Sequence, residues 1–118
     1  MSKYTDTITN MNILGVLLRD PSILEDTARY QINVNDFTQR LHKIIFSSIN
    51  NLYISGLSTI SSIDIANYLK TSGVKDQYVT FEKEKGIEFI DTCISVSDIS
   101  KLDYYYNKSK KFRYLREM

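Results

Sequence analysis

One proline and four glycines in 118 residues leave this chain few points at which a helix must stop. Apolar residues recur every three or four positions through most of its length, which is the spacing of one helical face, and no strand pattern stands out. The sequence therefore predicts an all-α fold. The expected helices cover 7–20, 21–30, 36–55, 63–72, 86–94 and 99–118. The stretch between 74 and 85 has no clear period.

Residues that favour helix ends stand between these segments. Asp20 can cap a new helix, and Pro21 suits its first position. Ser61 or Ser62 can cap the helix expected at 63–72. Gly56 follows the helix expected at 36–55, and Gly73 follows the one at 63–72, each as a C-terminal stop. Residues 31–35 are polar and are expected to form a loop.

The chain divides into two expected parts, a helical head over 1–85 and a helical hairpin over 86–118. The last two helices are separated only by the short polar break 95–98, which favours an antiparallel pair. A projecting hairpin cannot bury both of its faces, so its outer apolar residues need a partner. A second copy is one such partner, paired about a twofold axis. The predicted interface residues are Ile87, Ile90, Ile94, Leu102, Tyr105 and Phe112.

The sequence offers little for catalysis or metal binding. His42 is the single histidine and Cys93 the single cysteine, so a metal site of the usual His and Cys composition is nearly excluded. No phosphate-binding glycine loop and no nucleophile motif occurs. We therefore predict no catalytic residues, no metal ligands and no cofactor, and a structural role for both His42 and Cys93.

The last helix has an unusual charge. Between 101 and 118, six Lys and Arg residues stand against two acidic residues in a chain of net charge +1, with four tyrosines interleaved. Three interpretations remain open: a site for single-stranded nucleic acid, a protein interface rich in Tyr and Arg, or a solvated helix face. In the first, the contact residues would be Lys108, Lys110, Lys111 and Arg113.

Several segments, in order and at similar spacing, resemble the N-terminal domain of DnaB-type replicative helicases over residues 12–118. They are NILGVLLRDPSILED, LHKIIFSSINNLYISG, IDIANYLKTSG, GIEFIDTCIS and YYYNKSKKFRYLREM. The chain departs from the family pattern at four places. TITNMN replaces the acidic and glutamine residues that precede the first helix in the family. Lys85 replaces the first residue of a glycine pair, Ser61 replaces a capping Asp, and VSDIS occupies the hairpin turn. Such divergence favours a helicase encoded by a phage or mobile element.

The resemblance implies a non-catalytic domain of DNA replication. In the family, hairpins pair twofold, and three dimers form a collar over a hexameric motor where primase docks and loaders can act. ATP and Mg²⁺ would belong to a separate C-terminal ATPase domain that this chain lacks, and DNA contact would be mainly through that domain. Two alternatives are a small nucleic-acid-binding protein that uses the final helix, and a free-standing regulator of a helicase or primase.

The expected compartment is the cytoplasm. A lone cysteine suits a reducing environment, no apolar run reaches the length of a membrane span, and the first residues lack the apolar segment of a signal peptide. No membrane partner is expected.

Overall fold

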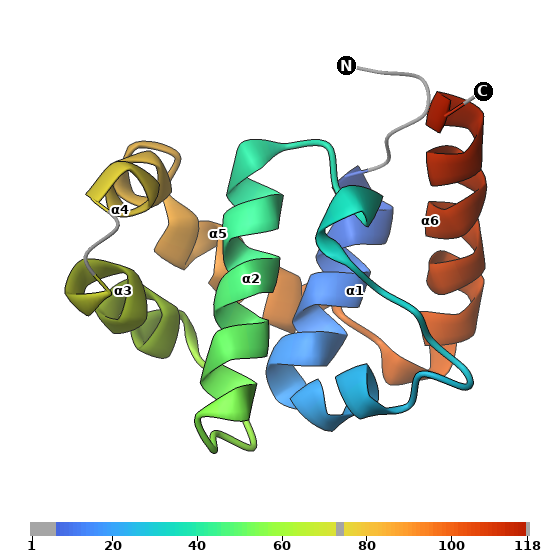
Figure 1. Ribbon diagram of the computed structural model, residues 1–118, viewed down its shortest axis with the longest axis horizontal. Helices are drawn as coiled ribbons and strands as arrows, with labels where there is room; N and C mark the ends of the chain where they lie inside the picture. Colours follow the sequence, from blue (N-terminus) through green and yellow to red (C-terminus); the bar gives the residue numbers. More distant parts are fainter. Residues whose placement is uncertain (1–6, 73–74, 118) are drawn as a thin grey trace.

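The computed structural model describes the backbone of residues 7–72 and 75–117 and the side chains of 7–72 and 75–115. Every regular element in these residues is a helix, so the all-α prediction is confirmed (Figure 1). The α-helices are α1 (Thr7–Arg19), α2 (Arg40–Ile54), α3 (Ser62–Thr71), α4 (Lys75–Lys83), α5 (Gly86–Val96) and α6 (Leu102–Glu117). Short 3₁₀ turns are η1 (Pro21–Glu25), η2 (Val34–Asp36) and η3 (Ile99–Lys101).

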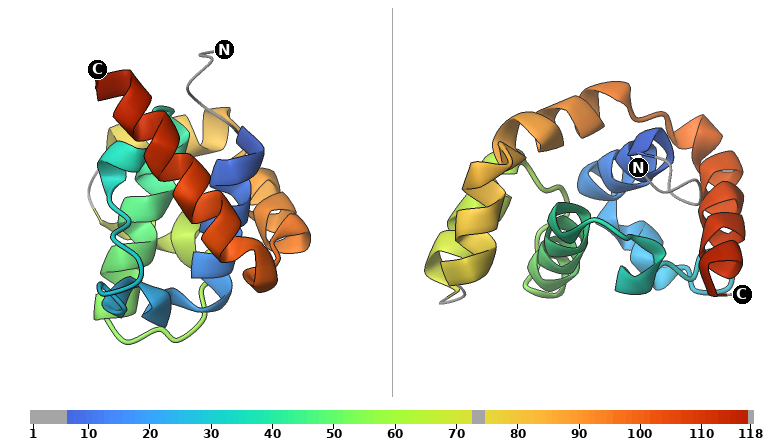
Figure 2. Two further views of the ribbon diagram at one scale, coloured as in Figure 1. Left: turned by 90° about the vertical axis from the view of Figure 1, so that its right-hand side faces the viewer. Right: turned by 90° about the horizontal axis from the view of Figure 1, so that it is seen from above.

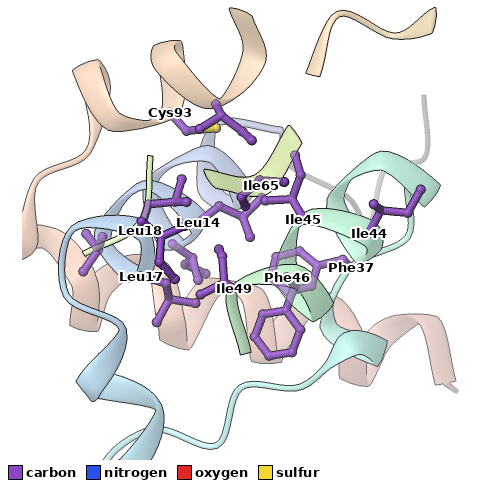
Figure 3. Close-up of a cluster of buried hydrophobic side chains, with 14 of the residues drawn as sticks. Leu14, Leu17, Leu18, Phe37, Ile44, Ile45, Phe46, Ile49, Ile65 and Cys93 are labelled. Carbon is purple, nitrogen blue, oxygen red and sulfur yellow. The ribbon is translucent and has the colours of Figure 1, made fainter. Parts of the chain in front are cut away.

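The core lies where α1 and α2 run beside each other, with α3 and α5 closing it (Figures 1 and 3). Its side chains come from the periodic apolar positions of these helices, and Leu14, Leu17, Ile45, Ile49 and Ile65 are completely buried. Burial of each such side chain contributes about 1.5–3 kcal/mol. On α1, Leu14, Leu17 and Leu18 are buried, whereas Ile8, which has the same helical spacing, is exposed.

Helix α5 approaches the backbone of α1 at Gly15. A Cβ atom at this position would overlap the carbonyl oxygen of Cys93 and lie 2.6 Å from Cβ of Ser97. Only glycine allows such an approach without moving one of the two helices. From the sequence alone, Gly15 is a residue of low helix propensity inside a helix. In the fold, it is the position at which α1 and α5 come into contact.

Two segments differ from the predictions. Residues 21–30 form only η1 and a turn, because the chain leaves the helical path at Asp26 and Tyr30 reaches toward α6. Residues 75–83 form α4, which was not expected. Phe81 is the single buried residue of this helix, and one buried position cannot produce a period in the sequence.

The predicted helix ends agree better. Ser61 caps α3 by accepting a hydrogen bond from the backbone N–H of Asp64, whose carboxylate accepts one from the N–H of Ser61. This reciprocal pair is a capping box. Gly56 follows α2 with φ +115°, a conformation that favours glycine. The predicted stop at Gly73 lies outside the described residues.

The antiparallel hairpin expected at 86–118 is not formed in the residues described. Helices α5 and α6 both pack on α1, from different sides, rather than along each other (Figure 2). Two extended residues, Ser97 and Asp98, redirect the chain between them. Arg19 of α1 donates to the carbonyl oxygen of Ser97 at 3.4 Å and so ties this junction to the body. The expectation failed because α6 finds polar partners on the far side of α1.

Candidate functional site

Helix α6 lies against the loop that contains residues 29–36, and polar side chains make most of the bonds between them. Four residues of α6 make these bonds, and we call them the inner stripe: Asp103, Tyr106, Lys110 and Arg113. Their spacing of three, four and three residues places them on one face of the helix. Each forms a hydrogen bond or an ion pair with a residue of the loop.

Asp36 is the centre of this contact near the C-terminal end of α6. Its side chain is 2% exposed, and its carboxylate accepts hydrogen bonds from Lys110 Nζ at 2.9 and 3.0 Å and from Arg113 Nη1 at 3.3 Å. It also accepts a bond from the N–H of Asn33 at 2.9 Å, which closes the capping box of η2. A buried carboxylate needs such partners, because an unpaired buried charge is costly. We call Asp36, Lys110 and Arg113 the Asp36 cluster.

The other end of the contact is formed by Asp103. Its carboxylate accepts a hydrogen bond from the Tyr30 hydroxyl and lies 3.4 Å from Arg29 Nη2. The hydrogen bond to Asp103 and the burial of the phenol raise the pKa of Tyr30 above 10.0. Between the two ends, the hydroxyl of Tyr106 accepts a bond of 2.8 Å from the N–H of Gln31. The loop is therefore attached to α6 along about three turns.

This arrangement changes the interpretation of the cationic residues predicted to contact nucleic acid. Lys110 and Arg113 point inward to Asp36, so their charges are used within the chain. Lys108 and Lys111 lie on other faces of α6, and the Lys108 ammonium stands 5.9 Å from the Tyr104 ring and 5.8 Å from the Phe112 ring. The side chain of Arg116 lies outside the described residues.

Sequence reasoning did not pair Asp36 with the last helix. The sequence does contain one indication of this contact. Polar residues occupy the inner stripe at a spacing of three, four and three residues, where a packed helix normally has apolar residues. That pattern calls for a polar partner elsewhere in the chain, but it does not identify the partner.

The six predicted interface residues are not all on the surface. Ile90 and Leu102 are 0% and 2% exposed, so they belong to the core of the single chain and are removed from the interface. Ile87 is exposed, while the other three are half-buried. The candidates that remain for contact with a partner are Ile87, Ile94, Tyr105 and Phe112.

The single histidine is a core residue. His42 is 1% exposed and stacks on Phe89 with ring centroids 5.0 Å apart. Asn10 Nδ2 donates to His42 Nδ1 at 3.3 Å, so the acceptor nitrogen must be unprotonated. Burial lowers the pKa of His42 from 6.5 to about 4. The structural role predicted for this residue is confirmed.

Cys93 is also buried, and burial raises the pKa of its thiol to about 12. A thiol in this state is not a nucleophile at neutral pH. Within the described residues, no three His, Cys, Asp or Glu side chains gather as a metal site would require. In the same part of the chain, no helix combines the length and apolar character needed to span a bilayer.

A scan against protein families matches residues 6–108 to the DnaB-like helicase N-terminal domain. The chain belongs to this family. The match covers most of the head and α5, and it ends inside α6. The domain is the non-catalytic N-terminal part of helicases of DNA replication, so the resemblance inferred from the sequence is confirmed.

The chain is also similar to the SPbeta prophage-derived protein YorI of Bacillus subtilis (strain 168). The two are 36% identical over 108 residues, which is 92% of this chain and 21% of that protein. The chain thus spans about a fifth of the length of this curated relative. A prophage relative agrees with the expected phage-encoded, divergent form. No solved structure matches the chain.

Proposed function

We propose that this chain is the assembly and partner-docking domain of a hexameric replicative DNA helicase. It would mediate dimerisation, organise the ring as a trimer of dimers, and contact a primase or a helicase loader. The membership of the chain in the N-terminal domain family supports this proposal. We also propose that it works in the cytoplasm, where a phage replication complex would assemble.

The surface of α5 and α6 is the part we propose for these contacts. Ile87 is 38% exposed on α5, and Ile94, Tyr105 and Phe112 are half-buried. Apolar and aromatic side chains that one chain covers only partly can complete their burial against another chain. The outer residues of α5 therefore support a protein interface more directly than the inner face of α6, whose polar groups are already paired.

Catalysis would reside in another part of the full-length protein. We propose that the whole protein is an ATP-dependent DNA helicase, with ATP and Mg²⁺ bound by a C-terminal ATPase domain. The relative is nearly five times as long as the matched segment, which leaves room for such a domain. We expect this 118-residue chain alone to bind no nucleotide in titration calorimetry, and the complete gene to encode a P-loop.

Sedimentation of the chain over a range of concentrations tests the assembly proposal. We expect a concentration-dependent dimer, and we expect Ile87→Lys to weaken it at least tenfold because a lysine replaces an apolar contact. Ile63→Lys is the matched control, since Ile63 is also an exposed isoleucine, on α3. A chain that stays monomeric at high concentration, with Tyr105→Ala changing nothing, would contradict the proposal.

A further inference from the structure

Helix α6 carries a second line of residues opposite the inner stripe. We call it the outer stripe, and it consists of Lys101 at the end of η3 followed by Tyr104, Lys108 and Lys111 of α6. These positions repeat the spacing of three, four and three residues, shifted by two residues from the inner stripe. A shift of two residues rotates a helix position by about 200°, which places the outer stripe on the opposite face.

The charge on α6 is sorted between the two faces. Asp103 is the acidic residue of this helix whose side chain is described, and it belongs to the inner stripe, where Tyr30 and Arg29 bind it. The outer stripe contains three lysines and no acidic residue. In the part of the chain that the structure describes, no other helix presents three cations at helical spacing on one face without an acid; the exposed charges of α5, for instance, are Glu88 and Asp91.

An aromatic ring lies among these lysines. Tyr104 is 63% exposed, and its ring meets that of Tyr105 at 77° with centroids 5.0 Å apart. The Lys108 ammonium lies 5.9 Å from its centroid. Two neighbouring side chains thus contact the ring while most of it faces solvent. An exposed ring between cations is the combination that binds a base by stacking and its phosphates by charge.

We propose that the outer stripe of α6 binds single-stranded nucleic acid without sequence preference. Lys101, Lys108 and Lys111 would contact phosphates, and Tyr104 would stack on one base. An acidic protein partner would also be attracted by the lysines, but it would have no use for an exposed aromatic ring at the centre of the charge. The four residues of the outer stripe are not among those assigned to the proposed interface, although Tyr104 contacts Tyr105 and Lys108 contacts Phe112.

Fluorescence anisotropy of a labelled oligothymidylate with the 118-residue chain tests this inference. Three phosphate contacts on a single strand predict a slope of about −2 in log K against log salt, or about a hundredfold weaker binding for a tenfold rise in salt. Lys101→Gln combined with Lys111→Gln should reduce the slope to about −0.7, because one lysine remains. Lys70→Gln combined with Lys75→Gln, on α3 and α4, is the matched control and should leave the slope unchanged.

Tyr104→Ala separates stacking from charge. We expect it to weaken binding about tenfold at every salt concentration with the slope unchanged. Tyr114→Ala is the control, since Tyr114 is equally exposed on α6 but lies off the outer stripe.

The inference is overturned if the chain does not bind the oligonucleotide at about 20 mM salt. It is also overturned if Tyr104→Ala has no effect while polyglutamate competes equally well. Finally, it fails if the double lysine variant alters self-association in sedimentation and leaves oligonucleotide binding intact.

Discussion

Different contacts hold two regions of the molecule in place. One region is the body, formed by α1, α2 and α5, and the other is the last helix, α6. In the body, apolar side chains interdigitate and the backbones of α1 and α5 approach each other at Gly15. Helix α6 also packs on α1 and buries Leu102 and Ser109, but it meets the loop 29–36 through hydrogen bonds and ion pairs. One short domain thus combines a core that salt should affect little with a last helix whose attachment depends partly on charge.

The largest effect is expected from Gly15→Ala, which tests the close approach in the body. The added Cβ would overlap the Cys93 carbonyl oxygen, and this neighbour is backbone that cannot turn away. We expect a loss of about 3 kcal/mol in the free energy of unfolding, measured by urea denaturation. Ser95→Ala, at an exposed position of α5, should cost almost nothing. A loss below about 1 kcal/mol at Gly15 would show that the two helices are not in close contact.

The next effect concerns the pH dependence of the body. His42 has a pKa of about 4 in the fold and 6.5 when unfolded, so the unfolded chain binds more protons between these values. Stability should therefore be complete above about pH 6.5 and fall by about 3 kcal/mol as the pH drops to 4. Protonation also places two donors face to face at the bond with Asn10. His42→Gln should remove this decline, and equal slopes for the two proteins over this range would refute the assignment.

A smaller and more local effect is expected from Asp36→Asn, which tests the attachment of α6. Asparagine keeps the shape and the capping oxygen but removes the negative charge that Lys110 and Arg113 face. Both cations are about a quarter exposed and can turn to water, so we expect a cost of about 2 kcal/mol rather than the larger cost of a fully buried pair. Hydrogen exchange should become faster in α6 and stay unchanged in α2. Equal acceleration in both helices would mean that α6 is an inseparable part of the core.

The same contrast explains how much could be predicted from the sequence. The helices of the body, the cap at Ser61 and the structural role of His42 follow from apolar spacing and from the lack of any partner residue for chemistry. The position of α6 does not follow, because Asp36 and Lys110 are 74 residues apart and polar pairing leaves no period. The hairpin was expected from the short break at 95–98, yet two extended residues there are enough to send α6 to the other side of α1.

The smallest expected effect is a gain, and it lies at the junction of α4 and α5. Lys85 stands where the family pattern has a glycine, and it adopts the left-handed conformation with φ 56° and ψ 52°. This conformation costs a residue with a side chain about 1–2 kcal/mol. Glycine avoids this cost, but its greater freedom in the unfolded chain offsets part of the stabilisation. Lys85→Gly should therefore stabilise the chain by about 0.5–1 kcal/mol in urea denaturation.

Lys83→Gly is the matched control for this last variant. It removes the same charge two residues earlier, at the last position of α4, where the backbone is helical and glycine should destabilise by up to about 1 kcal/mol. Opposite signs for the two variants would show that the left-handed backbone, and not the lost lysine, controls stability at this junction. Gly86 beside it packs against the Phe81 ring with no room for a Cβ atom between them, so a shift of the turn to relieve Lys85 would disturb a buried contact. A single substitution at Lys85 should therefore be enough to measure the strain.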